Sequence, residues 1–292
     1  MKRTLRRILF FFAALFAVLG GILQLPELLG DEPPAAELTD ETAAHFIDVG
    51  QGDSTLLLSG GQAILIDAGT KESGPAIVRY LQELGVEKLT AVVATHPHAD
   101  HIGGMAQVIE AFPIGHFYLG AETSNTATYG RMLDALEAHD VPTSVPQDGD
   151  EVTLDSGASL VFLGPADDVK NDNLNNRSLI TLFRAGSHSV LLMGDAETPA
   201  EQSLLLHHPR LSCEILKVGH HGSASSSSEE FLRTVQPETA VISCGRNNDY
   251  GHPSPKTLEN LSRAGIADVR ITAESGTVVI PLEPSSSKEN AA

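Results

Sequence analysis

The sequence predicts an α/β protein in which two β-sheets are covered by helices on their outer faces. Between residues 44 and 283, short apolar runs alternate with segments that have helical spacing of apolar residues. The runs occur in pairs with helical segments between them, which favours two sheets with helices outside. A chain of 292 residues is long enough for one large domain or two small ones.

The expected strands are 44–49, 54–58, 63–67, 89–94, 116–119, 151–154, 159–163, 178–184, 189–193, 214–217, 239–243, 268–272 and 277–281. The expected helices are 75–84, 105–111, 128–138, 199–206, 229–235 and 255–264. The run 89–94 illustrates the strand pattern, because β-branched Val92 and Val93 stand at its centre.

The ends of the chain have a different composition from this body. Residues 1–7 are basic and residues 8–25 are apolar except for Gln24, so 1–30 are predicted to be a signal anchor or a signal peptide. No A-x-A cleavage site follows directly, which favours an uncleaved membrane anchor with an extracytoplasmic body; a secreted protein is the alternative. Residues 31–43 are predicted to be a tether and 284–292 a disordered tail.

The charge of the body is strongly negative. Beyond residue 30 the chain has 15 basic and 37 acidic residues, so it repels polyanions at long range. This counts weakly against tight, sequence-independent DNA binding, although bound metal cations could still hold a phosphate. The two cysteines, Cys213 and Cys244, are predicted to be buried free thiols, with one disulfide as the alternative outside the cytosol.

Four potential metal ligands lie within six residues, at His96, His98, Asp100 and His101. They fall between the predicted strand 89–94 and a predicted helix, on the kind of loop where function concentrates in α/β proteins. His96 and His98 could bind one ion, and Asp100 with His101 a second. Imidazole and carboxylate ligands suit zinc, manganese or iron rather than calcium.

Two later strand ends carry further candidates. Asp195 follows an apolar run and could bridge two metals, or it could cap the next helix. His220 and His221 follow another strand. Because neighbouring side chains diverge on extended backbone, we expect one imidazole to bind metal and the other to face substrate; a surface pair is the alternative.

Other polar residues could support such a site. Asp67 ends a strand and could orient a ligand imidazole. Asp48 and Asp53 flank a glycine-interrupted turn that could equally be a structural hairpin. His252 could protonate a leaving group or bind a phosphoryl oxygen, or it could be structural. Lys217 could offset phosphate charge or simply pack.

Together these motifs resemble the metallo-β-lactamase superfamily, and in particular the extracytoplasmic hydrolase domain of ComEC-type DNA-uptake proteins. The resemblance covers about residues 44–281. It rests on His96-x-His98-x-Asp100-His101-x-Gly103-Gly104, on Asp67 and Asp195 as the first-motif and bridging aspartates, and on the segments 48–54, 220–223 and 250–253.

The resemblance implies a metallo-β-lactamase-like αββα sandwich that holds two divalent ions, Zn²⁺ or Mn²⁺, at one edge between the sheets. Metal one would take His96, His98 and Asp195, helped by Asn175 or Asn176. Metal two would take Asp100, His101, Asp195 and either His220 or His221. Asn175 and Asn176 stand where most members supply another histidine, as in ComEC-like domains, and an amide oxygen suits manganese better than zinc.

The function implied is that of a metal-dependent hydrolase, a phosphodiesterase or nuclease that uses a metal-bridged hydroxide. The candidate catalytic residues are Asp100, His221 and His252. The candidates behind the ligands or beside the substrate are Asp48, Asp53, Asp67, Asn175, Asn176, Ser178 and Lys217. Two alternatives stay open: a hydrolase of another ester, such as a phosphorylcholine ester or a lactone, and a non-catalytic metal-bearing module in DNA uptake.

The partners expected from these features are a phosphodiester substrate, with DNA as one candidate, and the membrane through the N-terminal helix. The sequence does not fix the oligomeric state.

Overall fold

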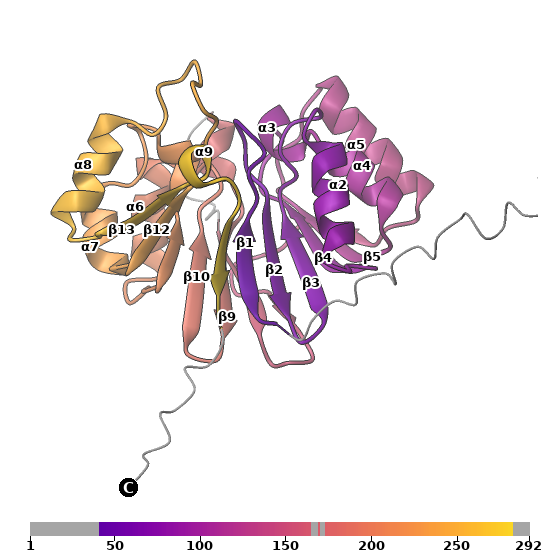
Figure 1. The fold of residues 1–292 in the computed structure, drawn as a ribbon, viewed down its shortest axis with the longest axis horizontal. Coiled ribbons are helices and arrows are strands. Elements are labelled where there is room, and N and C mark those ends of the chain that lie inside the picture. Colours follow the sequence, from indigo (N-terminus) through magenta and orange to yellow (C-terminus); the bar gives the residue numbers. More distant parts are fainter. Residues whose placement is uncertain (1–40, 165–168, 170–172, 283–292) are drawn as a thin grey trace, which may run out of the picture. The chain divides into compact units, whose positions relative to one another are not determined.

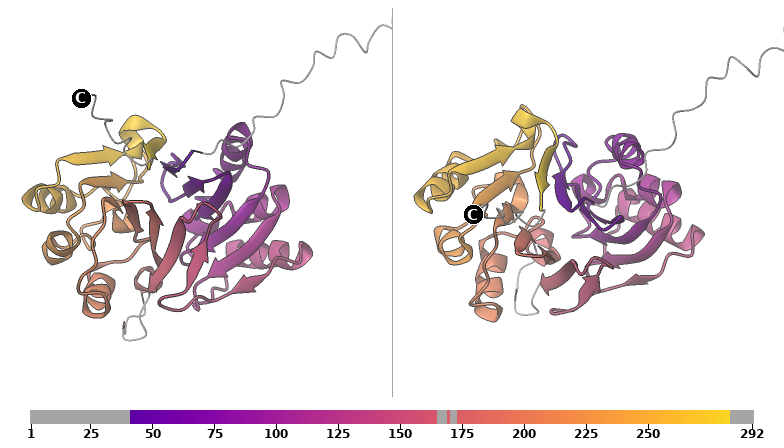
Figure 2. Two further views of the ribbon diagram at one scale, coloured as in Figure 1. Left: turned by 90° about the horizontal axis from the view of Figure 1, so that it is seen from below. Right: turned by 60° about the horizontal axis from the view of Figure 1, so that its bottom comes forward.

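The computed structural model describes residues 41–164, 169 and 173–282. Two sheets pack face to face and helices cover their outer faces (Figures 1 and 2), so the predicted α/β class and layer order are confirmed. The predicted anchor 1–30, most of the tether and the tail 284–292 lie outside the described residues. Within the described ranges, no helix is long and apolar enough to cross a bilayer.

The first sheet has the strand order β14-β1-β2-β3-β4-β5-β6. Its strands are β1 (Ala43–Phe46), β2 (Thr55–Ser59), β3 (Gln62–Ile66), β4 (Leu89–Ala94), β5 (Ile114–Leu119), β6 (Thr143–Ser144) and β14 (Val278–Pro281). The pairs from β3 to β6 are parallel and the rest antiparallel. Apolar residues of α2 (Gly74–Glu83), α4 (Met105–Ala111) and α5 (Ala127–Ala138) pack on its outer face.

The second sheet has the order β13-β12-β11-β10-β9-β8-β7. Its strands are β7 (Glu151–Thr153), β8 (Ser159–Gly164), β9 (Ile180–Ala185), β10 (His188–Leu192), β11 (Ile215–Lys217), β12 (Thr239–Ile242) and β13 (Asp268–Ile271). The pairs from β10 to β13 are parallel. Apolar residues of α6 (Thr198–His207), α7 (Glu229–Val235) and α8 (Pro255–Arg263) pack on its outer face.

Strand β4 shows why these apolar runs become central strands. Ala91 and Val93 point into the core between the sheets, whereas Val92 and Ala94 pack toward the helices of the first sheet. Because successive side chains alternate in direction and both faces are covered, every position of the strand except Thr90 is apolar. The same burial on both sides fixes the position of the loop that follows β4.

The predicted elements match the structure closely, and β4, α4 and α7 have the predicted bounds. The first strand ends at Phe46, earlier than the predicted residue 49. The sequence analysis missed β6, the one-turn helices α3 (Ala99–Ile102) and α9 (Thr272–Ser275), and the 3-10 turns η2 (Leu174–Arg177) and η3 (Gly219–Gly222). These elements are too short to show a hydrophobic period. Cys213 and Cys244 are buried and free, as predicted.

Candidate metal centre

The candidate ligands come from loops at the carboxyl ends of strands in both sheets. His96, His98 and His101 follow β4, Asp195 follows β10, and His221 follows β11. In α/β folds the crevice outside the carboxyl ends of parallel strands is the usual binding region. The loops bring these side chains into two groups that could each hold a metal ion.

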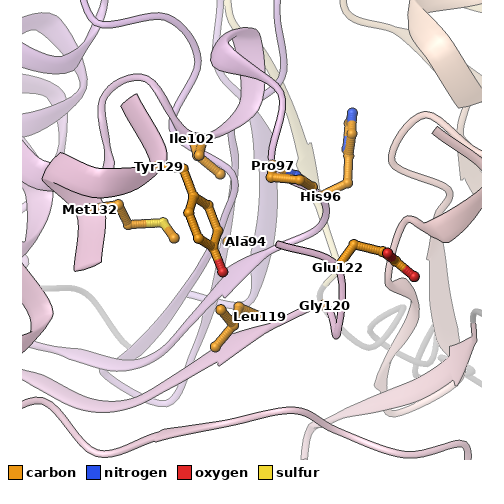
Figure 3. A pocket seen from close by; sticks show the side chains of 9 residues that line it. All are labelled: Ala94, His96, Pro97, Ile102, Leu119, Gly120, Glu122, Tyr129 and Met132. Atoms are coloured by element: carbon orange, nitrogen blue, oxygen red, sulfur yellow. The ribbon is translucent and has the colours of Figure 1, made fainter. Parts of the chain in front are cut away.

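The first group consists of His96, His98 and Asp195. His96 Nε2 lies 3.0 Å from His98 Nδ1 and 3.7 Å from Asp195 Oδ2. Behind His96, apolar side chains that include Tyr129 and Met132 leave a cavity of only about 10 Å³ (Figure 3). A cavity of this size holds at most one water, so close packing fixes the backbone of the loop.

The second group consists of Asp53, His101, Asp195 and His221, all of them buried. His101 Nε2 lies 3.1 Å from Asp195 Oδ1, and His221 Nε2 lies 3.5 Å from the same oxygen. Asp195 therefore belongs to both groups and directs a different carboxylate oxygen toward the histidines of each.

Several buried polar atoms in this region have no hydrogen-bond partner among the described residues. They are His101 Nε2, His221 Nε2, Asp195 Oδ1, Asp53 Oδ1 and Asn175 Oδ1. Buried polar atoms are normally hydrogen-bonded. Nitrogen and oxygen atoms that lack such partners and converge on one point are free to coordinate a metal ion. The two groups are thus compatible with a binuclear metal site.

Asp67 fixes the orientation of the His101 ring. His101 Nδ1 donates to Asp67 Oδ2 at 2.7 Å, so Nε2 faces Asp195. Asp67 also accepts hydrogen bonds from the backbone nitrogen and the hydroxyl of Thr95, at 2.9 and 2.7 Å. A carboxylate placed in this way behind an imidazole selects its tautomer and raises its basicity.

Gly52 allows Asp53 to reach the centre. A Cβ atom at Gly52 would lie 2.4 Å from the carbonyl oxygen of Asp100, and the Asp53 backbone nitrogen donates to that oxygen at 3.1 Å. The structure places Asp53 in the second group, where the sequence analysis expected Asp100. Asp100 is still close, with Oδ2 3.3 Å from His221 Nε2.

Lys217 is buried and contacts Asp53 of the second group. Its Nζ donates to Asp53 Oδ2 at 2.8 Å, and its side chain is 2% exposed, too little to face a substrate. Burial alone would raise the pKa of Asp53, but Lys217 and His221 outweigh it and hold that pKa well below its usual range. Lys217 therefore keeps a carboxylate of the centre ionised.

His220 and His221 diverge, but not on extended backbone as we expected. Both have left-handed conformations, with φ of 48° and 53°. His221 Nδ1 donates to the carbonyl of Ser243 at 3.0 Å, whereas His220 Nδ1 donates to Glu197 Oε1 at 3.0 Å. His220 Nε2 lies 3.8 Å from Asp195 Oδ2, so His220 is beside the first group and His221 within the second.

Glu197 is a functional candidate that the sequence analysis missed. Besides His220, it accepts from the hydroxyl of Ser225 at 2.9 Å and from Asn173 Nδ2 at 3.0 Å. Its position two residues after Asp195 was the one available clue. Its partners lie far away in sequence, so the contacts could not be anticipated.

The asparagine segment lies against this part of the centre. Asn175 Nδ2 lies 3.4 Å from the His220 ring nitrogens, which leaves the unpartnered Oδ1 available. Asn176 Oδ1 accepts from the Glu197 backbone nitrogen at 3.1 Å. Ser178 Oγ accepts from the Asp195 backbone nitrogen at 3.0 Å. Asn176 and Ser178 thus hold the backbone that carries both carboxylates.

Asp48 and His252 lie outside both groups. Asp48 Oδ1 accepts from the backbone nitrogen of Gly50 at 3.1 Å, so Asp48 stabilises its own turn. The His252 ring centroid lies 6.2 Å from that of His221. Burial, followed by the neighbouring His221 and His220, lowers the pKa of His252 to about 4.

The carboxylates and imidazoles of the centre shift one another's pKa values. Burial alone would lower the pKa of His221, but Asp195 and Asp53 outweigh it and raise the pKa to about 10. Burial alone would raise the pKa of Asp195, but His101 and His221 outweigh it and hold the pKa well below its usual range. The polypeptide thus keeps the shared carboxylate in the ionised form that a metal requires.

Comparisons with known proteins agree with this geometry. Residues 47–246 match the sequence model of the metallo-β-lactamase superfamily. The chain is 31% identical over 259 residues to ComE operon protein 3 of Bacillus subtilis, covering 82% of this chain and 33% of that protein. It is 32% identical over 239 residues to competence protein ComA of Neisseria gonorrhoeae, covering 81% and 32%.

The chain therefore spans about a third of the length of these relatives, and the similarity to competence proteins that the motifs indicated is confirmed. Among solved structures, the metallo-β-lactamase fold protein YhfI from Bacillus subtilis aligns with a TM-score of 0.55 at 12% identity. That alignment covers 82% of this chain and 99% of YhfI, and it supports the fold.

Proposed function

Because the chain belongs to the metallo-β-lactamase superfamily, we propose that it is a metal-dependent phosphodiesterase that cleaves DNA outside the cytoplasm. The observation that carries this proposal is Asp195, a buried carboxylate shared by two groups of histidine and aspartate ligands. A carboxylate shared in this way suits a pair of divalent ions, which is the arrangement of many phosphoesterases and nucleases.

Each of the two groups would bind one metal ion. His96, His98 and Asp195 would hold one ion, and His101, Asp195 and His221 the other, with Asp53 and Asp100 as the neighbouring carboxylates. Two bound divalent ions would supply Lewis acidity toward a phosphoryl oxygen and would acidify a water. Asp67 holds the His101 ring in place, and Lys217 keeps Asp53 ionised. These supports reduce the reorganisation that ion binding would require.

His252 belongs to neither group, and its ring lies next to those of His220 and His221. Its lowered pKa favours the neutral ring near pH 7, so its N–H is suited to donate a hydrogen bond to a phosphoryl oxygen. Of the two roles considered for His252, this one agrees better with its surroundings than protonation of the leaving group.

DNA is the proposed substrate because one of the relatives, which aligns with 81% of this chain, is a competence protein. The basic and then apolar segment 1–25 supports attachment to a membrane with the body outside the cytoplasm. The acidic body is no obstacle to cleavage, since bound cations would act on one phosphate at short range.

The test is hydrolysis of bis-p-nitrophenyl phosphate and of single-stranded DNA by protein loaded with Mn²⁺ or with Zn²⁺. We expect turnover of both substrates with at least one metal and none after chelation. Failure on both substrates with a metal-loaded, folded protein would refute the proposal. Cleavage of a phosphorylcholine ester or a lactone instead would favour the other-ester hypothesis. Metal binding without turnover of any ester would favour the non-catalytic module.

A further inference from the structure

A groove of about 480 Å³ opens directly beside the metal centre. It is lined by loops from both halves of the domain and by α5, and its charged, amide and aromatic side chains are Gln51, Lys71, Glu72, Asp100, Arg131 and Tyr250. Asp100 Oδ2 lies 3.3 Å from His221 Nε2. A polymer bound with one unit at the centre can therefore place a neighbouring unit in this groove.

Two cations in the groove are available to a ligand. Lys71 and Arg131 are exposed, and neither forms an ion pair with another residue in the described part of the chain. Arg131 Nη2 donates to Thr128 Oγ1 at 3.1 Å, which positions the guanidinium and leaves its other donors free. Glu72 and Asp100 also line the groove and balance these two charges, so Lys71 and Arg131 would act on phosphates by direct contact rather than by long-range attraction.

Tyr250 offers an aromatic face at the rim of this groove. The residue is 71% exposed, and its ring stacks on His252 with an interplanar angle of 22° and centroids 5.7 Å apart. The loop beneath it is held by Asn248, whose Oδ1 accepts from the backbone nitrogens of Tyr250 and His252 at 3.1 and 2.9 Å. An exposed tyrosine on a loop that hydrogen bonds hold in place can stack on a ligand ring with little loss of conformational entropy.

We propose that this groove binds single-stranded nucleic acid next to the scissile phosphodiester, with Lys71 and Arg131 at the phosphates and Tyr250 against a base. The inference rests on the proposed phosphodiesterase function and names its substrate class. Single-strand binding sites combine cations along the backbone with aromatic rings on which bases stack. A phosphodiester polymer without bases would use the cations and not the tyrosine.

The test is equilibrium binding of a fluorescein-labelled oligothymidylate in EDTA, measured by anisotropy over a range of salt concentrations. We expect K71A and R131A each to weaken binding and to reduce the slope of log affinity against log salt by about 0.7. The matched control is K88A, which removes an exposed lysine at the opposite end of β4. K88A should change neither the affinity nor the slope.

Tyr250 is tested with a pair of ligands. We expect Y250A to weaken binding of oligothymidylate about tenfold and to leave binding of an abasic strand of equal length unchanged, whereas Y250F should bind both normally. Equal losses on both strands would overturn base stacking. The groove itself would be excluded if K71A and R131A behaved like K88A.

Catalysis separates this inference from the proposed function. We expect K71A, R131A and Y250A to lose kcat/KM on the oligothymidylate while they keep that on bis-p-nitrophenyl phosphate, which is too small to fill the groove. If the wild-type protein hydrolyses neither substrate, the phosphodiesterase proposal fails, while the binding data still decide whether the groove recognises nucleic acid. Equal losses on both substrates would contradict a role confined to the groove.

Discussion

His101 and His220 lie on opposite sides of Asp195, and their surroundings differ. The His101 side chain is fully buried and is held by Asp67, which Thr95 holds in turn. The His220 side chain is 23% exposed and leans on Glu197, which Asn173 and Ser225 hold. The His101 side of the centre is thus buried and supported by the first sheet, whereas the His220 side opens toward solvent.

The difference in burial indicates which side of the centre should determine the metal affinity. A buried imidazole in a carboxylate network cannot turn without breaking several hydrogen bonds, so the His101 side should set metal affinity. An imidazole that is partly in water loses less when a partner is removed, because water can replace that partner. The His220 side should therefore tolerate change better than the His101 side.

The largest effect is expected where the two sides meet. Because Asp195 serves both groups, D195N should lower hydrolysis of bis-p-nitrophenyl phosphate by at least about a thousandfold. Its urea unfolding curve shows whether the fold persists. A folded, metal-loaded D195N protein with near wild-type turnover would remove the basis for a shared carboxylate.

The next effect separates the two sides. D67N should lower the affinity for Mn²⁺ or Zn²⁺ by about 10- to 100-fold, because the His101 ring loses its charged acceptor. Competition with a chromophoric chelator measures this loss. D48N is the matched control, since Asp48 caps its own turn outside both groups, and it should bind metal normally.

A smaller effect is expected at Glu197. E197Q should weaken metal binding by less than about tenfold, because His220 is partly exposed and keeps Asn175 as a neighbour. The same chelator competition applies. If E197Q loses as much affinity as D67N, the two sides are equally rigid and the division described above is wrong.

The smallest expected effect is a loss of stability at low pH that arises in the first sheet, away from the metal centre. His45 in β1 is buried, contacts the Tyr80 hydroxyl at 2.7 Å, and has a pKa lowered by burial from 6.5 to about 4. The unfolded chain therefore takes up the proton first. The contribution of the neutral ring to the free energy of unfolding is fully present above pH 6.5. It is lost as the pH falls toward about 4.

Urea unfolding of the metal-free protein checks this expectation. Between about pH 7 and about pH 5 the free energy of unfolding of the wild type should fall by about 2 kcal/mol more than that of H45F. Y80F keeps the imidazole and should retain the wild-type acid dependence. The same loss in H45F as in the wild type would place the acid-sensitive group elsewhere.

Much of this molecule could be predicted because its main elements are long and periodic. The run that became β4 was located at both ends, since its apolar residues are bounded by the ligand loop. The histidines of that loop were identified because their spacing is local in sequence. Asp195 could be identified in the same way, because it directly follows an apolar strand.

The remaining parts depend on contacts between distant segments. Asp53 enters the second group because Gly52 lets its loop touch Asp100, and nothing in the sequence near Asp53 indicates that approach. His220 and His221 are separated by left-handed backbone, which two adjacent histidines do not predict. Glu197 acquires its role through Ser225 and His220, both more than twenty residues away.

The pairing of β14 with β1 has a consequence for how the protein is made. The first sheet is built mainly from residues 43–144, yet its edge is covered by residues 278–281, which are synthesised after every other strand in the described part of the chain. Until they emerge from the ribosome, β1 presents unpaired backbone groups that can recruit a strand from another nascent chain. A chain that ends before residue 278 should therefore aggregate rather than fold into a smaller domain.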